Sequence, residues 1–162
     1  LKGLNIFFPE LSYLCQLSSK DFDAVGENLE LVLNKRAKHV IYENERVNSA
    51  VQLLKKDKIT EFGELMNQSH QSLKELFEVS TPEIDLLVSI AKNLSGCYGS
   101  RLTGAGFGGC IVSLVETSSV STFKKDLESK YKQLSGLDVE TYVCKASDGV
   151  KVYWHDLSKN NS

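Results

Sequence analysis

The residues best suited to chemistry lie in one short segment, 100–109, which reads Ser-Arg-Leu-Thr-Gly-Ala-Gly-Phe-Gly-Gly. Four of the chain's 11 glycines fall within its last six positions. Glycine loses more backbone freedom on folding than any other residue, so this density indicates a backbone that takes positive φ or approaches another group closely. Successive N–H groups left uncovered in such a loop form a concave site for anions such as phosphate. A tight turn between two strands is the alternative, and the segment alone leaves both open.

Three well-known glycine-rich loops do not fit this segment. Gly104, Gly106 and Gly109 match the dinucleotide pattern G-x-G-x-x-G, but that pattern requires a helix after the loop, and 110–115 is a short β-branched run typical of a buried strand. No Gly-Lys-Ser/Thr follows, which excludes a Walker A loop. The H-R-D and D-F-G elements of protein kinases are also absent.

The elements that must position this loop fall into two regimes. Residues up to about Leu94 predict helices, because apolar residues recur at helical spacing. Ser18 to Asp21 has the form of a capping box, and Thr81 followed by Pro82 marks another helix start. The predicted apolar stripes are 22–32, 37–54, 62–76 and 84–94.

After Gly96 the period of the pattern changes. Residues 110–115 predict a strand, and 120–134 predict a helix that stops at Gly136. Residues 139–146 and 150–154 are rich in β-formers and predict two strands joined by a turn at 147–149. The whole chain therefore predicts an α+β fold, with helices packed on one face of a small antiparallel or mixed sheet.

Length and composition exclude several classes of protein. With 162 residues the chain is long enough for one domain, and its net charge of −2 and pI near 6.0 do not favour a nucleic-acid binder. No apolar run approaches the roughly 18 residues of a membrane span, and no secretory signal is recognisable. Since Leu1 is not an initiator methionine, we expect a processed chain or a piece of a longer one.

Cysteine and histidine spacing predicts no metal site. No C-x-x-C pair exists, and the histidines lack ligand spacing. We expect buried, reduced thiols, including an inert Cys110 where the chain enters its apolar strand. The cysteines are Cys15, Cys97, Cys110 and Cys144, and the histidines are His39, His70 and His155.

The glycine-rich segment, running through Cys110 into the strand after it, closely resembles the third signature of the GHMP kinases in its galactokinase form. The resemblance extends along roughly residues 14–153 in the family's order and spacing. Its other segments are Arg36–Val47, Gly63–His70, Val79–Asp85 and Cys144–Gly149.

The resemblance implies a ferredoxin-like sheet of mostly antiparallel strands packed against helices, with additional N-terminal helices. Residues 1–162 would form a single GHMP-kinase C-terminal domain. Residues 1–17 would be a remnant of the linker or preceding half, and 158–162 a frayed tail.

Galactokinases transfer the γ-phosphoryl group of ATP to the anomeric hydroxyl of galactose with Mg²⁺, so the resemblance implies this reaction and these cofactors. The family's catalytic Asp and ATP-phosphate loop belong to an N-terminal half that has no match here, so we expect the chain alone to be inactive. Its implied partners are that N-terminal half, the sugar and ATP, with no nucleic acid and no membrane, in a cytoplasmic, monomeric enzyme. The alternatives are half of an N-acetylgalactosamine kinase, a non-catalytic regulator that senses sugar and ATP, or a free-standing interaction module.

By the same resemblance, the loop lies against the N-terminal half near the reacting centre, with no catalytic residue and no metal ligand in this chain. Arg101 is either a phosphate clamp or a structural ion-pair partner, and both readings stay open. Phe107 is expected to be a packing anchor, and His70 a hydrogen-bonded structural histidine. The residues expected near substrate or phosphate are Ser100, Arg101, Thr103, Gly104, Ala105, Gly106, Phe107, Gly108 and Gly109.

Overall fold

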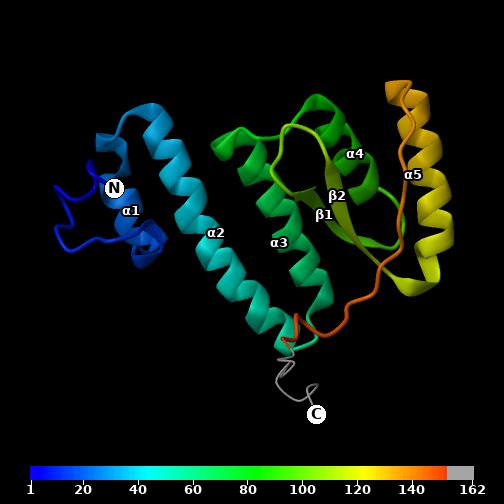
Figure 1. The fold of residues 1–162 in the computed structure, drawn as a ribbon, viewed down its shortest axis with the longest axis horizontal. Coiled ribbons are helices and arrows are strands. Elements are labelled where there is room, and N and C mark those ends of the chain that lie inside the picture. Colours follow the sequence, from blue (N-terminus) through cyan, green and yellow to red (C-terminus); the bar gives the residue numbers. More distant parts are fainter. Residues whose placement is uncertain (153–162) are drawn as a thin grey trace, which may run out of the picture.

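Helices fill the first part of the chain, and a two-stranded sheet followed by one more helix fills the second (Figure 1). The structure, a computed structural model, describes residues 1–152. Its elements are α1 (Ser19–Val25), α2 (Leu31–Lys55), α3 (Ile59–Ser72), α4 (Pro82–Lys92), β1 (Cys97–Thr103), β2 (Cys110–Val115) and α5 (Val120–Ser135). Short 3₁₀ turns span Leu14–Gln16, Gly26–Asn28 and Thr117–Ser119, and a π-helical segment, Leu73–Phe77, extends α3.

The predicted helix ends are confirmed where local chemistry determines them. Ser18 Oγ accepts a hydrogen bond from the Asp21 N–H at 3.1 Å, and Thr81 caps α4 in the same way. Gly136 ends α5 in the left-handed conformation at φ 75°.

The first predicted helix is shorter than its apolar stripe. Gly26 starts a 3₁₀ turn, Leu29 is extended, and α2 begins afresh at Leu31. Glycine is a poor helix former, so the continuous stripe through Val32 concealed a break in the backbone.

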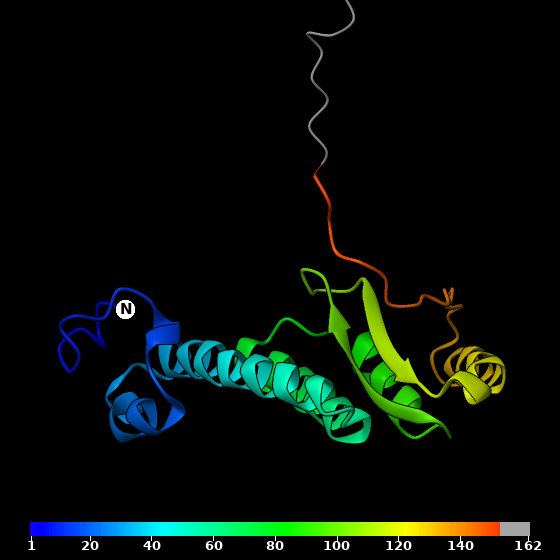
Figure 2. The same ribbon diagram turned by 90° about the horizontal axis from the view of Figure 1, so that it is seen from below.

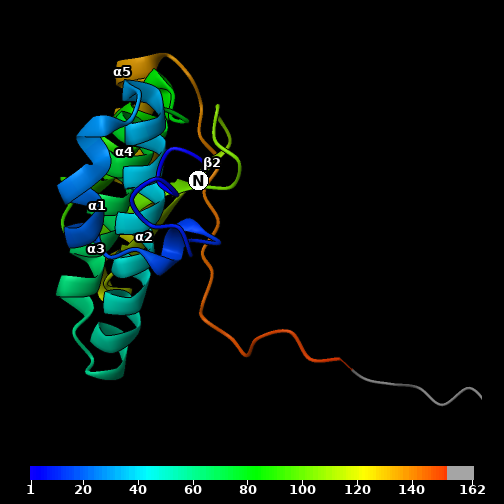
Figure 3. The same ribbon diagram turned by 90° about the vertical axis from the view of Figure 1, so that its left-hand side faces the viewer.

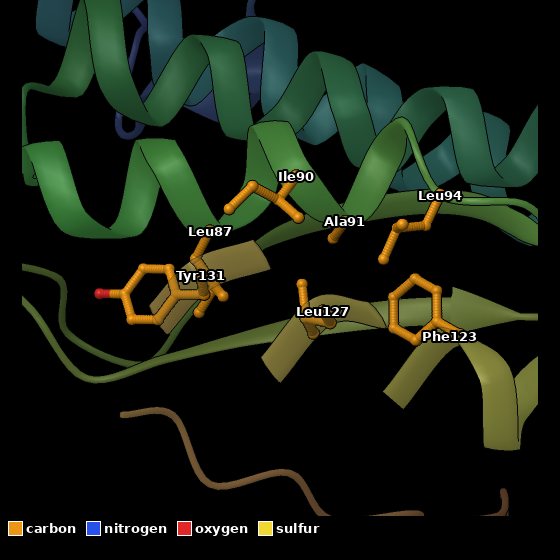
Figure 4. Packing of buried hydrophobic residues seen from close by; sticks show 7 residues of the cluster. All are labelled: Leu87, Ile90, Ala91, Leu94, Phe123, Leu127 and Tyr131. Atoms are coloured by element: carbon orange, nitrogen blue, oxygen red, sulfur yellow. The ribbon is translucent and has the colours of Figure 1, made fainter. Parts of the chain in front are cut away.

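The helices form consecutive layers around the sheet. Helices α2 and α3 run side by side in opposite directions, and α4 lies against one face of the β1–β2 hairpin (Figures 1 and 2). Helix α5 packs on α4, and their facing residues form the core drawn in Figure 4. These residues are Leu87, Ile90, Ala91, Leu94, Phe123, Leu127 and Tyr131.

Helix α3 approaches β1 more closely than side chains normally permit. A Cβ on Gly63 would lie 2.2 Å from the Tyr98 carbonyl oxygen, and a Cβ on Gly99 would lie 1.9 Å from the Gly63 carbonyl oxygen. Only hydrogen at both positions leaves room for the two backbones. The helix is therefore held against the strand at a fixed distance.

The α+β class and the antiparallel pairing are confirmed, but the predicted strands at 139–146 and 150–154 are wrong within the described residues. Strand pairing in residues 1–152 is confined to β1 and β2. Residues 139–146 instead lie along α5, where the Lys124 ammonium and the Glu128 carboxylate both bond Thr141. Residues with high β propensity form a strand only where a partner strand is available. Residues 153–162, including the expected frayed tail, lie outside the described part.

The apolar stripe predicted for α2 is only partly covered. Ala37 and Ile41 are buried, whereas Val47, Val51 and Leu54 are exposed. Within residues 1–152, no helix combines the length and the apolar character needed to cross a membrane.

Replacement of Gly63 by Ala tests the close contact of α3 with β1. Helix propensity alone predicts a gain of about 1 kcal/mol for this change. Because the new methyl group meets backbone rather than a movable side chain, we expect a loss of about 3 kcal/mol in the free energy of unfolding. Urea denaturation measures it. Gly149→Ala, where a Cβ meets nothing within 4 Å, is the control; a stabilised Gly63→Ala variant would contradict the contact.

Candidate functional site

The glycine-rich loop, residues 104–109, joins β1 to β2 and projects from the helical layers (Figure 3). Five of its residues have positive φ: Gly104, Gly106, Phe107, Gly108 and Gly109. All but one are glycine, which takes this conformation without steric cost. The turn between strands and the exposed backbone, which were alternatives in the sequence, are thus present together.

The middle of the loop, at Gly106 and Phe107, is docked on Val79, in the segment between α3 and α4. The Phe107 N–H donates to the Val79 carbonyl oxygen at 2.7 Å. A Cβ on Gly106 would lie 2.5 Å from that same oxygen, whereas a Cβ on Gly104 would meet nothing within 4 Å. Gly106 is therefore required by contact as well as by φ, and Gly104 by φ alone.

Two side chains of α3 bond the backbone of β1 just before the loop. Asn67 Oδ1 accepts from the Ser100 N–H at 3.0 Å, and His70 Nδ1 accepts from the Leu102 N–H at 3.3 Å. The Ser100 hydroxyl is fully buried and bonds Ser113 Oγ on β2 at 2.8 Å. Ser100 therefore serves the sheet, and it does not present its hydroxyl to a ligand.

His70 is a hydrogen-bonded structural histidine, as expected. Its Nδ1 accepts from Leu102, so its Nε2 carries the proton and lies 3.3 Å from Asp85 Oδ1. Asp85 also accepts from Ser80 and pairs with Lys74 at 2.9 Å. Burial lowers the pKa of His70, although the Asp85 carboxylate opposes that shift. Burial acts to raise the pKa of Asp85, but the bonds from Ser80 and Lys74 outweigh it and hold that pKa below its ordinary value.

Arg101 has the contacts of a structural ion-pair partner. Its Nη1 lies 3.2 Å from Glu43 Oε1 on α2, and its Nε donates to the Leu102 carbonyl oxygen at 3.0 Å. The same Glu43 carboxylate accepts from Ser69 and pairs with Arg46. Of the two readings left open by the sequence, these contacts favour the ion pair, which ties β1 to α2 and α3.

Two sequence predictions about this region are wrong. The Phe107 side chain is 75% exposed, so the residue anchors the loop through its backbone N–H and not by packing. Cys110 is exposed, as are Cys15 and Cys144, while Cys97 is half-buried. All four are free thiols, as expected. The hairpin turns outward at the loop, which carries the first residue of β2 into solvent.

Besides the exposed Phe107, much of the outer side of the loop is backbone. Within residues 1–152, the Phe107 N–H is the only N–H group of the loop that donates to an acceptor in the protein. Thr103 and Ala105 are exposed beside it. The arrangement can therefore offer peptide N–H groups and one hydroxyl to an anion. No three His, Cys, Asp or Glu side chains in the described residues are grouped to hold a metal ion.

Sequence reasoning missed three features of the site: strand β1, the Val79 carbonyl contact and the pairing of Asn67 with Ser100. Gly63, within an otherwise amphipathic helix, was a usable signal for strand β1. Glycine lowers helix stability, so its presence there indicates that another backbone comes close. Nothing in the side chain of Val79 signals a role for its carbonyl.

The pH dependence of stability tests the His70 network. Protonation is harder in the folded state because the pKa of His70, like that of buried His39, is lowered from 6.5. The unfolded chain then binds more protons. The contribution of these histidines to the free energy of unfolding is therefore complete above pH 6.5 and decreases as the pH drops below it. Urea titrations between pH 7.5 and pH 5 measure this slope. Glutamine does not titrate, so the free energy of unfolding of His70→Gln should depend less steeply on pH. An equal slope would contradict the assignment of His70 as a buried, neutral histidine.

Matched alanine substitutions test the docking of the loop on Val79. Both Gly104→Ala and Gly106→Ala carry the strain of a left-handed φ, near 88° and 87°. Only the second places a methyl group against backbone, so we expect it to lose about 1–3 kcal/mol more in the free energy of unfolding. Urea denaturation of the two variants measures the difference. Equal losses would mean that the contact with Val79 does not constrain the loop.

Comparison with known proteins places this loop in a family. The model described as "GHMP kinases C terminal" matches residues 50–133. The galactokinase of Roseiflexus sp. (strain RS-1) is 47% identical over 93% of this chain, and that of Clostridium tetani is 44% identical over 91%. The chain spans 38% of the length of each of these relatives.

A solved structure gives the same result in three dimensions. The crystal structure of Lactococcus lactis galactokinase complexed with galactose superposes on 80% of this chain with a TM-score of 0.76 and 40% sequence identity, and the match covers 34% of that chain. The resemblance of the motifs, the family model and the shared fold agree. The chain belongs to the GHMP kinase C-terminal family.

Proposed function

We propose that this chain is the C-terminal portion of a galactokinase, which phosphorylates galactose to galactose 1-phosphate with ATP. Residues 1–162 are the single C-terminal domain in this proposal, with residues 1–17 belonging to the junction with the preceding half. The observation that carries it is the similarity to galactokinases along nine-tenths of the chain, including the whole loop. That the relatives compared are galactokinases favours galactose over N-acetylgalactosamine, and catalysis over sensing.

The chain's part in the reaction is to close the site around the transferring phosphoryl group. Phosphoryl transfer depends on positioning and on stabilising charge spread over phosphate oxygens. The peptide N–H groups of residues 104–106, 108 and 109, left uncovered by small side chains, are suited to approach such oxygens. Thr103 adds a hydroxyl at the end of β1. The proposed substrate-proximal set is therefore 103–109, whereas Ser100 and Arg101 hold its base.

Magnesium is not assigned to residues of this chain. Mg²⁺ bound with ATP neutralises phosphate charge in such reactions. It prefers carboxylate oxygens, phosphates and water, and the outer side of the loop presents no carboxylate. In this proposal, the nucleotide and the N-terminal half hold the ion, and the catalytic acid also lies in that half.

A chimera tests the proposal. The matched C-terminal part of the Roseiflexus galactokinase is replaced by this chain, and ADP release is measured with ATP and galactose. We expect galactose-dependent ADP release from the chimera, because the loop and its supports are retained. The 162-residue chain alone and the truncated relative alone should release none.

Two outcomes would overturn the proposal. A chimera that melts cooperatively yet releases no ADP with galactose would show that this chain cannot complete the site. Galactose-dependent turnover by the isolated chain would contradict the assignment of the catalytic groups to the N-terminal half.

A further inference from the structure

The segment between α3 and α4 has an unusual backbone. Helix α3 widens into the π-helical segment Leu73–Phe77, and Glu78 then takes a left-handed conformation with φ 57° and ψ 45°. A residue with a Cβ is disfavoured there, and such conformations persist only where the surroundings hold them. The next residue is Val79, whose carbonyl docks the loop. The left-handed backbone of Glu78 therefore needs support from its surroundings.

Helix α2 holds it through two cations. Lys35 Nζ lies 2.7 Å from Glu78 Oε1, and Arg36 Nη2 lies 2.7 Å from Glu78 Oε2. Each carboxylate oxygen thus has its own partner. The other guanidinium nitrogen of Arg36, Nη1, bonds the Leu76 carbonyl oxygen. Both the side chain of Glu78 and the backbone before it are fixed to one turn of α2.

The opposite side of the same segment faces the loop. The Val79 carbonyl oxygen accepts from the Phe107 N–H at 2.7 Å, and Val79 itself is buried. The ion-paired Glu78 is thus the residue directly before the carbonyl that docks the loop. A rotation of the backbone at Glu78 would turn the carbonyl away from Phe107, since the two share consecutive peptide units.

We propose that Glu78 is a positioning residue for the glycine-rich loop: its pairing with Lys35 and Arg36 fixes the Val79 carbonyl that holds Phe107. The catalytic consequence rests on the proposed function, but the effect on the loop does not. Lys58 and Glu61, at the start of α3, form a comparable surface ion pair of 2.8 Å, and no hydrogen bond or ion pair within residues 1–152 joins either residue to the loop.

Hydrogen exchange of the Phe107 amide directly measures how firmly its hydrogen bond to the Val79 carbonyl is held. In the 162-residue chain, Glu78→Gln should speed exchange of this amide about three- to tenfold, the range expected when exposed ion pairs are lost. The Leu127 amide in the core of α5 serves as a reference, because it reports the change in overall stability. Glu61→Gln, the matched control, should leave the Phe107 amide unchanged.

Salt and a second variant sharpen the result. Because these ion pairs are partly exposed, 1 M NaCl should speed Phe107 exchange in the unmodified chain but not in Glu78→Gln. Arg36→Gln should speed it too, and the double variant should add little to either. Unchanged Phe107 exchange in Glu78→Gln, or equal acceleration of Phe107 exchange by the control Glu61→Gln, would overturn the proposal.

Activity forms a separate arm. In the active chimera, Glu78→Gln should lower kcat about three- to tenfold in step with the exchange rate, with KM for galactose unchanged. Glu61→Gln should keep full kcat. Unchanged kcat with faster exchange would remove the catalytic role. A wild-type chimera without activity would count against the proposed function. The exchange experiment would still test whether Glu78 positions the loop.

Discussion

The rest of the structure depends on the contact between helix α3 and strand β1. Gly63 and Gly99 bring the two backbones together, closer than any side chain would permit. At that distance, Asn67 and His70, one helical turn apart on α3, reach the N–H groups of alternate residues of β1. A sheet of two strands is thereby fixed to the helical layers.

From this contact the position of the loop follows. The loop is supported on the β1 side by α3 and on the other side by the Val79 carbonyl, and the ion pair of Arg101 with Glu43 joins the same strand to α2. These supports combine polar side chains and backbone with a small apolar cluster of Val79, Ile84, Val88 and Leu102, while the larger core between α4 and α5 lies elsewhere (Figure 4). Loop placement therefore depends mainly on contacts outside the larger core. A change in the loop supports can alter chemistry while the core stays intact.

How far sequence alone reaches depends on the range of the interaction. Helix ends at Ser18, Thr81 and Gly136 were predictable, because each is determined by residues within one turn. The glycine-rich loop and its family were predictable from the motif. Strand β1 and the roles of Val79 and Phe107 were not, because they depend on backbone groups that every residue carries. The strand predicted at 139–146 was wrong for a related reason. Its residues have high β propensity, but propensity does not determine whether a partner strand lies beside them.

The pairing of Asn67 and His70 with β1 also determines where this sheet can grow. A bare edge strand offers a row of N–H and C=O groups to any extended peptide, including a copy of itself. On β1 that row is occupied by side chains of α3, so this edge is closed to additional strands. Within residues 1–152, β2 pairs only with β1, so its outer edge carries no second strand. In the described part of the chain, a further strand can therefore join this sheet only beside β2, and pairing of two such edges would join two molecules and leave no edge for a third.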